Sequence, residues 1–182
     1  MLNHSKIYTF DNIIPNNLQN LIQEYVENTQ GLIWRIKKDF GSNTNRNNNY
    51  TISPGFQNVF INDLGISDER FFKLTKPIVD NSFKNLNLIY KKITIGRTFY
   101  QMPLRHYEGL AMPHIDTTDP HTVVLYYVCD SDGDTVFFNN DKEIIKSVTP
   151  KKGSVVVFNG NIYHSNYLPL KNNRSVINFN VI

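Results

Sequence analysis

The second half of the chain, from Leu88 onward, consists of short runs of β-branched and aromatic residues that Gly, Pro, Asn and Asp interrupt. Such runs are typical of strands in antiparallel sheets, and the interrupting residues suit the turns between them. The runs predict strands at about 88–101, 111–117, 121–129, 134–139, 143–148, 154–158, 162–165 and 174–181. Short strands at this close spacing favour a sandwich or a barrel.

The first half of the chain predicts two helices. Apolar residues recur at helical spacing from about residue 15 to 28, and Asp11 is a candidate cap for this helix. A second helix is expected from Ser67–Asp68–Glu69 to about Phe83, with a kink or break at Pro77. Helices followed by many strands predict a mainly β fold in which the helices pack on one face of a sheet.

Length and composition fit one domain over residues 1–182, with a helical support layer over about 1–87 and a β core over about 88–182. The net charge of +3 comes from scattered Lys and Arg, which argues against a nucleic-acid partner. Neither a signal sequence nor a membrane-spanning run is apparent, and a single cysteine suits a reducing compartment. We therefore expect a soluble, cytoplasmic protein that does not bind membranes, and the pattern leaves its oligomeric state open.

The polar segment 41–49 contains no core-forming residue, and it is interpreted as a flexible loop or as a lid. Trp34, which precedes it, could border a bound substrate together with this segment.

The residues that predict chemistry begin with His114–Ile115–Asp116. In a strand, residues two apart project from the same face, so the imidazole and the carboxylate should converge. His164 follows the apolar run 155–158 and can supply a third ligand from a neighbouring strand. Two histidines and one carboxylate on one side of a metal leave three positions open, which is typical of non-haem iron(II) oxygenases.

The final predicted strand has one polar and one apolar face. Arg174, Val176, Asn178 and Asn180 alternate with Ser175, Ile177, Phe179 and Val181. The apolar face suits the helix layer, so Arg174 should point into a cavity, where a buried guanidinium needs an anion. Its planar fork suits a carboxylate, and we expect it to hold the far end of a dicarboxylic cosubstrate that chelates the metal.

In combination, these features resemble the 2-oxoglutarate/iron(II) dioxygenase superfamily, and within it the prolyl-4-hydroxylase-like branch, including small members of the kind phages encode. The resemblance covers roughly residues 88–182. It is carried by His114–Ile115–Asp116, the runs 122–127, 133–138 and 150–158, His164 and Arg174. The fold that this resemblance implies is a double-stranded β-helix, also called a jelly roll or cupin-like fold, with the metal near one open end.

The resemblance also implies the roles of individual residues. Iron(II) would be held by His114, Asp116 and His164, and the C5 carboxylate of 2-oxoglutarate by Arg174. Tyr127 matches a tyrosine that the family directs at that carboxylate, and Tyr107 is the nearest match to a further tyrosine, with Tyr100 as its competitor. O₂ would be the co-reactant, and ascorbate is a candidate additional reductant.

The implied activity is hydroxylation of a C–H bond with release of succinate and CO₂, on a peptidyl or free amino-acid substrate, with proline as the first guess. An alternative is an oxygenase of the same class that acts on nucleic acid or on a small metabolite. Nucleic-acid dealkylases carry a second arginine six residues after the first, where this chain has Asn180, and halogenases lack the carboxylate that Asp116 supplies. From another class, a non-catalytic binding module with the same fold stays an alternative.

Overall fold

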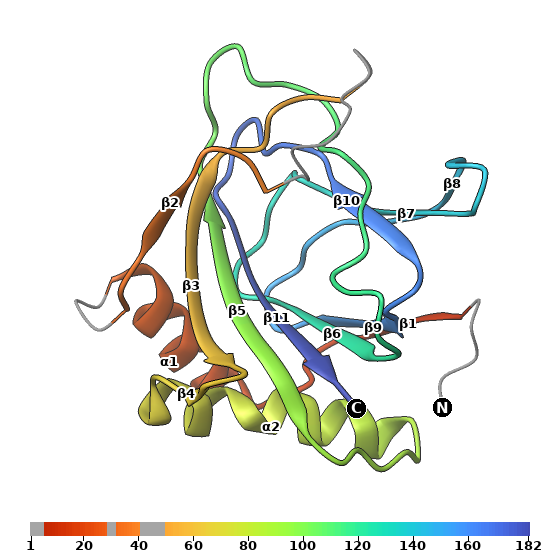
Figure 1. Cartoon of the computed structure of the whole chain (residues 1–182). Coiled ribbons are helices and arrows are strands. Elements are labelled where there is room, and N and C mark those ends of the chain that lie inside the picture. The colour runs from red at the N-terminus through yellow and green to blue at the C-terminus, as the bar shows by residue number, and fades with distance from the viewer. Residues whose placement is uncertain (1–5, 29–31, 41–49) are drawn as a thin grey trace.

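The computed structural model describes residues 6–28, 32–40 and 50–182, and consists of two antiparallel β-sheets with two helices (Figure 1). The polar segment 41–49 lies outside the described residues. The helices are α1 (Asn16–Glu27) and α2 (Glu69–Asn85). The strands are β1 (Ile7–Phe10), β2 (Arg35–Lys37), β3 (Gly55–Asn62), β4 (Gly65–Ile66), β5 (Ile93–Gln101), β6 (Thr122–Tyr127), β7 (Thr135–Phe138), β8 (Ile144–Val148), β9 (Val155–Asn159), β10 (Tyr163–Asn166) and β11 (Arg174–Val181).

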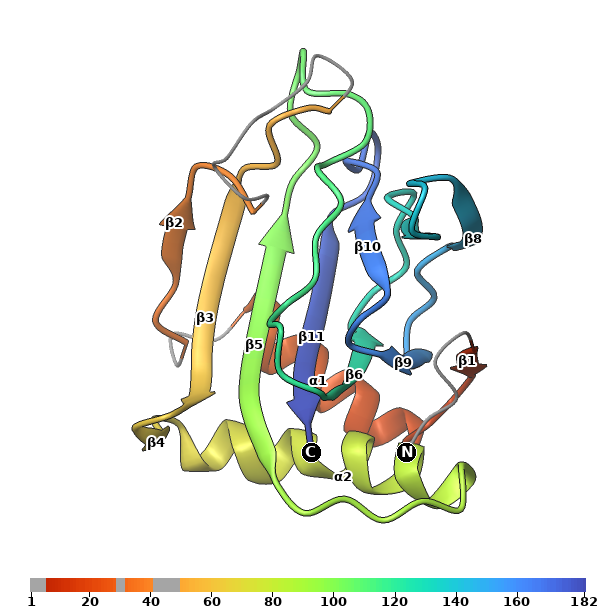
Figure 2. The ribbon, with the colours of Figure 1, turned by 45° about the vertical axis from the view of Figure 1, so that its right-hand side comes forward.

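The larger sheet has the strand order β1-β9-β6-β11-β5-β3-β2, with β4 beside β3. Its centre is β11, which pairs antiparallel with β5 on one side and with β6 on the other. The smaller sheet has the order β10-β7-β8. Figure 2 shows both helices running beneath the larger sheet, so the predicted fold class, a mainly β fold with a helical layer on one sheet, is confirmed.

The two faces of the larger sheet bury different cores. On the helix side, Ile177 and Phe179 of β11 pack with Ile22 of α1 and Phe71 of α2. On the other side, Val176 of β11 belongs to a second cluster that includes strands of both sheets. The face pattern predicted for the last strand is therefore confirmed, because its apolar residues lie against the helices.

The helix ends depart from the prediction in one respect. Asp68 caps α2, because its Oδ1 accepts a hydrogen bond from the Phe71 amide at 2.8 Å, and α2 continues through Pro77. The prediction that Asp11 caps the first helix is wrong. Pro15 precedes α1, and no side chain caps that end.

The predicted division into a helical layer over 1–87 and a β core over 88–182 also needs correction. Strands β1 to β4 all lie before residue 87, and β3 pairs with β5 in the larger sheet. The first half of the chain therefore builds part of the sheet as well as the layer that supports it.

Among the described residues, the helices are all too short or too polar to cross a membrane.

Replacing Phe71 by alanine should lower the free energy of unfolding by about 3–5 kcal/mol, the usual cost of removing a buried aromatic side chain. Phe71 is fully buried and contacts the rings of Tyr25 and Phe60 at centroid distances of 5.1 and 4.7 Å. Chemical denaturation measures the change. Leu64→Ala is the control, since Leu64 is 98% exposed, and it should change stability by less than about 0.5 kcal/mol. Equal effects of the two substitutions would contradict the assignment of the core.

Candidate metal centre

His114 and His164 are placed opposite each other by the backbone. Each donates its amide hydrogen to the carbonyl oxygen of the other, at 3.0 Å in both directions, as an isolated antiparallel bridge. His164 belongs to β10, so the bridge attaches the segment around His114 to the smaller sheet. The two imidazole rings lie 4.8 Å apart between centroids. Two histidines fifty positions apart in the chain are thus brought to one point.

The predicted strand at about 111–117 is not formed as a regular strand. Only single bridges occur there, at Leu110, Ala111 and His114, and Asp116 lies in a bend. The convergence of His114 and Asp116 therefore has a different cause from strand alternation. Asp116 is held from the larger sheet, since its Oδ1 lies 2.7 Å from the guanidinium of Arg97 and its Oδ2 accepts from Nδ2 of Asn178 at 3.0 Å.

His114, Asp116 and His164 form the one cluster of potential metal ligands found among the described residues. Their ligand atoms all lie within 4.8 Å of one another, so a single ion could contact all three side chains. The structure therefore brings together the three residues predicted as metal ligands.

The charge states at this cluster suit a metal. Burial alone would raise the pKa of Asp116, but the positive charge of Arg97, followed by His164 and the Asn178 hydrogen bond, lowers that pKa to about 2. Burial, followed by the neighbouring His114, lowers the pKa of His164 to about 4. At neutral pH the carboxylate is therefore ionised and the His164 imidazole is neutral, the forms in which both groups bind metals.

The ring orientation of both histidines is set by backbone carbonyl groups. Nδ1 of His114 lies 3.1 Å from the Met112 oxygen, and Nδ1 of His164 lies 3.2 Å from the Ile162 oxygen. A carbonyl oxygen only accepts hydrogen bonds, so in the neutral rings Nδ1 carries the proton and Nε2 keeps its lone pair for a ligand bond.

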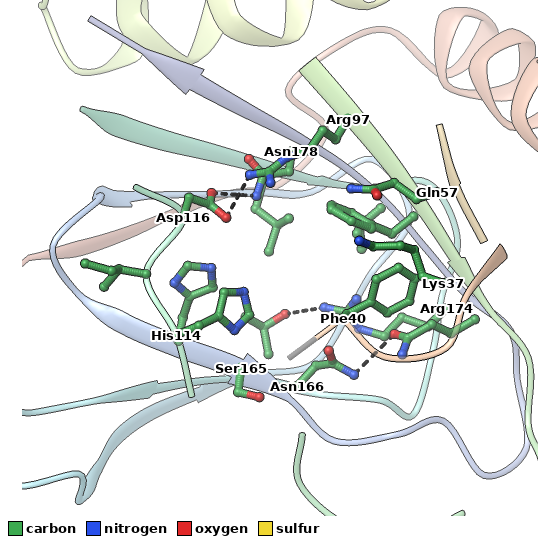
Figure 3. Close-up of a pocket in the computed structure, with 17 residues that line it drawn as sticks. Lys37, Phe40, Gln57, Arg97, His114, Asp116, Ser165, Asn166, Arg174 and Asn178 are labelled. Atoms are coloured by element: carbon green, nitrogen blue, oxygen red, sulfur yellow. Dashed lines mark hydrogen bonds and ion pairs between the residues drawn. The ribbon is translucent and has the colours of Figure 1, made fainter. Parts of the chain in front are cut away.

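Arg174 lines the same cavity, whose volume is about 280 Å³ (Figure 3). Its side chain is buried, its Nε donates to the Gly133 carbonyl at 2.9 Å, and Nη2 donates to Oγ1 of Thr135 at 2.9 Å. Among the described residues, no carboxylate forms an ion pair with it. A buried cation with only neutral partners is costly, which indicates a site for an anion.

The three tyrosines predicted near the cosubstrate occupy different places. Tyr127 is fully buried and donates a hydrogen bond to Oγ1 of Thr135 at 2.8 Å, the same atom that Arg174 contacts. Tyr107 is 38% exposed and does not line the cavity. Tyr100 points to the opposite face of β5 from its cavity-lining neighbours Phe99 and Gln101, and packs near Trp34.

Several cavity residues were missed by the sequence analysis. Arg97 of β5 pairs with Asp116, and Lys37, Phe40 and Gln57 come from the first half of the chain. Arg97 could have been found by alternation, because it shares a strand face with Phe99 and Gln101. Lys37 and Gln57 carry no such signal, since they reach the cavity only through the pairing of β2 with β3 and of β3 with β5.

Solved structures with the same fold include a member of the 2OG-Fe(II) oxygenase family. One is an oxidoreductase of the 2OG-Fe(II) oxygenase family from Burkholderia pseudomallei, with a TM-score of 0.71, 10% identity, and coverage of 96% of this chain and 84% of that chain. A second is the viral collagen prolyl hydroxylase of Paramecium Bursaria Chlorella virus-1 in complex with 2OG, with a TM-score of 0.65, 14% identity, and coverage of 97% and 96%.

A third similar structure is HygX from Streptomyces hygroscopicus, with nickel, 2-oxoglutarate and hygromycin B bound. It has a TM-score of 0.61 and 9% identity, and the match covers 98% of this chain and 83% of that chain. At these identities the likeness establishes the fold, and the predicted double-stranded β-helix is confirmed. Neither a protein-family model nor a curated protein sequence matches the chain.

Replacing His164 by alanine should abolish tight binding of a divalent transition metal. Two remaining ligands hold an ion poorly, and we expect the affinity to fall by more than the ~100-fold that loss of a supporting residue causes. Calorimetric titration of the purified chain with manganese(II) or iron(II) measures the change. His106→Ala is the matched control, because His106 is exposed and outside the cluster. A variant that kept wild-type affinity would remove His164 from the ligand set.

Replacing Arg97 by glutamine should weaken metal binding by about 10–100-fold, the usual range for a residue that orients a ligand. The loss follows because burial would then favour the protonated form of Asp116. The same titration, repeated at several pH values, measures it. Arg105→Gln replaces an exposed arginine outside the cavity and should leave the affinity unchanged. If Arg97→Gln bound metal as tightly as Arg105→Gln, Arg97 would have no part in positioning Asp116.

Proposed function

We propose that this chain is an iron(II)- and 2-oxoglutarate-dependent dioxygenase, formed as one domain over residues 1–182. The observation that carries the proposal is the pairing of two features in one cavity. His114, Asp116 and His164 converge there, and the buried Arg174, which has no carboxylate partner among the described residues, lines the same cavity. Strands from both halves of the chain line this cavity, which supports a single oxygenase domain.

The donor set fits iron(II). Two imidazoles and one carboxylate occupy one side of an ion and leave open positions on the other, as in the facial triad of non-haem iron oxygenases. When bound, the iron would supply the oxidative chemistry, which converts 2-oxoglutarate, O₂ and a substrate C–H bond into succinate, CO₂ and an alcohol. Asp116 would be kept in its ligand orientation by Arg97 and Asn178, which contact its two oxygens.

Arg174 fits the C5 carboxylate of 2-oxoglutarate. Its guanidinium fork can donate two parallel hydrogen bonds to a carboxylate, and its burial strengthens that interaction. Thr135 supports this role. Its Oγ1 accepts from both Tyr127 and Arg174, so its own hydroxyl hydrogen is left for a further acceptor such as the same carboxylate. Tyr127 would thereby act on the cosubstrate through Thr135. The proposed roles of Tyr107 and Tyr100 have no comparable support from their positions.

For the substrate, we propose hydroxylation of a peptidyl or free amino acid, with proline as the first candidate. The support is the structural likeness to the viral collagen prolyl hydroxylase. HygX, whose structure contains hygromycin B, has the same fold, so the fold alone does not select the substrate. O₂ is the co-reactant of the proposed reaction, and ascorbate would serve as an additional reductant.

Purified chain with iron(II), 2-oxoglutarate and O₂ should form succinate slowly, and faster when a substrate is added. Arg174→Ala should raise the 2-oxoglutarate concentration needed for half-maximal turnover, because a buried charge-assisted contact is worth about 2–5 kcal/mol. Iron binding by this variant should be largely retained. Succinate formation over a range of 2-oxoglutarate concentrations measures the effect.

Arg174→Lys is the matched variant for this experiment, since it keeps the charge and loses the fork, and it should show an intermediate requirement. An Arg174→Ala variant that folds, as judged by its melting temperature, and still needs no more 2-oxoglutarate than the wild type would remove Arg174 from this role. A non-catalytic binding module, the competing function, would instead form no succinate and show no 2-oxoglutarate-dependent iron absorption band under anaerobic conditions.

A further inference from the structure

The cavity has a second wall, formed by the first half of the chain, that the proposed iron and 2-oxoglutarate sites do not use. This wall consists of Lys37 of β2, Gln57 of β3, and Phe40 from the segment after β2. Figure 3 shows these residues across the cavity from His114 and Asp116. In the same view, the ammonium group of Lys37 points into the cavity beside Phe40. A substrate whose C–H bond faced the metal ligands would contact this wall.

This wall adds a positive charge for which the cavity offers no partner. The charged lining residues, apart from the histidines, are Lys37, Arg97, Arg174 and Asp116, so cations exceed carboxylates by two. Arg97 is already paired with Asp116. Arg174 is buried where a cosubstrate carboxylate would reach it. Lys37 is exposed and, among the described residues, has no ion pair, so its charge is available to a further ligand.

Binding of the cofactors would not cancel this excess. A ferrous ion brings two positive charges and 2-oxoglutarate brings two negative charges, so together they leave the balance of the cavity unchanged. Low-dielectric walls concentrate the field of such a cleft, and a ligand of opposite sign is attracted. The assembled site should therefore prefer an anionic substrate to a neutral or cationic one.

The apolar part of the wall and the size of the cavity restrict the ligand further. Phe40 and Phe99 contact each other edge to face, with centroids 5.1 Å apart, and both line the cavity. They offer a fixed apolar surface next to Lys37 and Gln57. A volume of about 280 Å³ must also hold 2-oxoglutarate, so a small molecule or a single side chain of a larger one fits beside it.

We propose that this wall is a substrate site for a small acid, with its carboxylate or phosphate group bound by Lys37 and the Gln57 amide. The apolar body of the acid would lie against Phe40 and Phe99, and its C–H bond would face His114 and Asp116. The inference rests on the proposed oxygenase function and refines it. Of the peptidyl and free amino acids proposed above as substrates, it favours a free acid over an internal peptidyl proline, which has neither an α-carboxylate nor a charged side chain.

The test uses the full chain loaded with manganese(II) and 2-oxoglutarate, so that no turnover occurs and binding alone is measured. Binding of manganese(II) and 2-oxoglutarate is established first, and its failure would count against the proposed function itself. N-acetyl-L-amino acids, which are anionic, are then titrated by calorimetry against their uncharged C-terminal amides, and sugar phosphates against the parent sugars. At least one acid should bind about tenfold more tightly than its neutral analogue. The two sets of probes distinguish a carboxylate from a phosphate ligand.

Substitutions then assign the preference to Lys37. Lys37→Gln should weaken binding of the selected acid by about three- to tenfold and leave its neutral analogue unaffected. Lys37→Arg should largely retain the preference. Lys38→Gln is the matched control, since Lys38 is exposed, adjacent in sequence and absent from the cavity lining. It should bind both members of the pair as the wild type does.

Three results would overturn the proposal while the oxygenase function stands. The loaded chain could bind no acid in either set, acids and neutral analogues could bind equally, or the preference could survive in Lys37→Gln. Tight binding of an oligonucleotide or a neutral proline peptide in place of the small acids would likewise reject this site.

Discussion

The candidate centre depends on one backbone interaction, the two-hydrogen-bond bridge between His114 and His164. Their side chains alone could not meet, because His114 lies in a segment without regular structure and His164 lies on the smaller sheet. The bridge makes the two residues direct cross-strand partners, which brings their side chains close. Asp116 then follows two residues later, in a bend where Arg97 and Asn178 of the larger sheet can hold it. The centre thus spans the gap between the two sheets.

The two faces of a single strand, β11, have different roles, one in folding and one in the candidate site. Ile177, Phe179 and Val181 pack against the helix side, where burial of apolar surface stabilises the fold. Arg174 and Asn178, on the opposite face, line the cavity. Burial of these polar groups costs free energy unless each finds a partner. Asn178 donates a hydrogen bond to Asp116, whereas the hydrogen-bond acceptors of Arg174 are neutral, so its guanidinium is the group on this face that is left for an anionic ligand.

Much of this arrangement could be predicted from the sequence, and the exceptions share a physical cause. The strands after residue 120, the apolar face of β11 and the histidine and aspartate cluster follow from local patterns, because alternation and turn residues act over a few positions. Strand β3 was missed, since its place in the sheet depends on pairing with β5 about forty residues later. Lys37 and Gln57 were missed for the same reason. The convergence of His114 and Asp116 was predicted correctly but for the wrong reason. A regular strand does not form there, and the backbone bridge to β10 and the contacts with Arg97 and Asn178 hold the two residues instead.

The central claim is that three side chains hold one ferrous ion with a guanidinium behind it. Anomalous diffraction at the iron edge, from crystals grown anaerobically with iron(II) and 2-oxoglutarate, tests it most directly. The account predicts a single peak at bonding distance, about 2.0–2.2 Å, from both histidine Nε2 atoms and an Asp116 oxygen, with density for a dicarboxylate ending at Arg174. A map without a peak between these residues, or with the dicarboxylate bound away from Arg174, would contradict it.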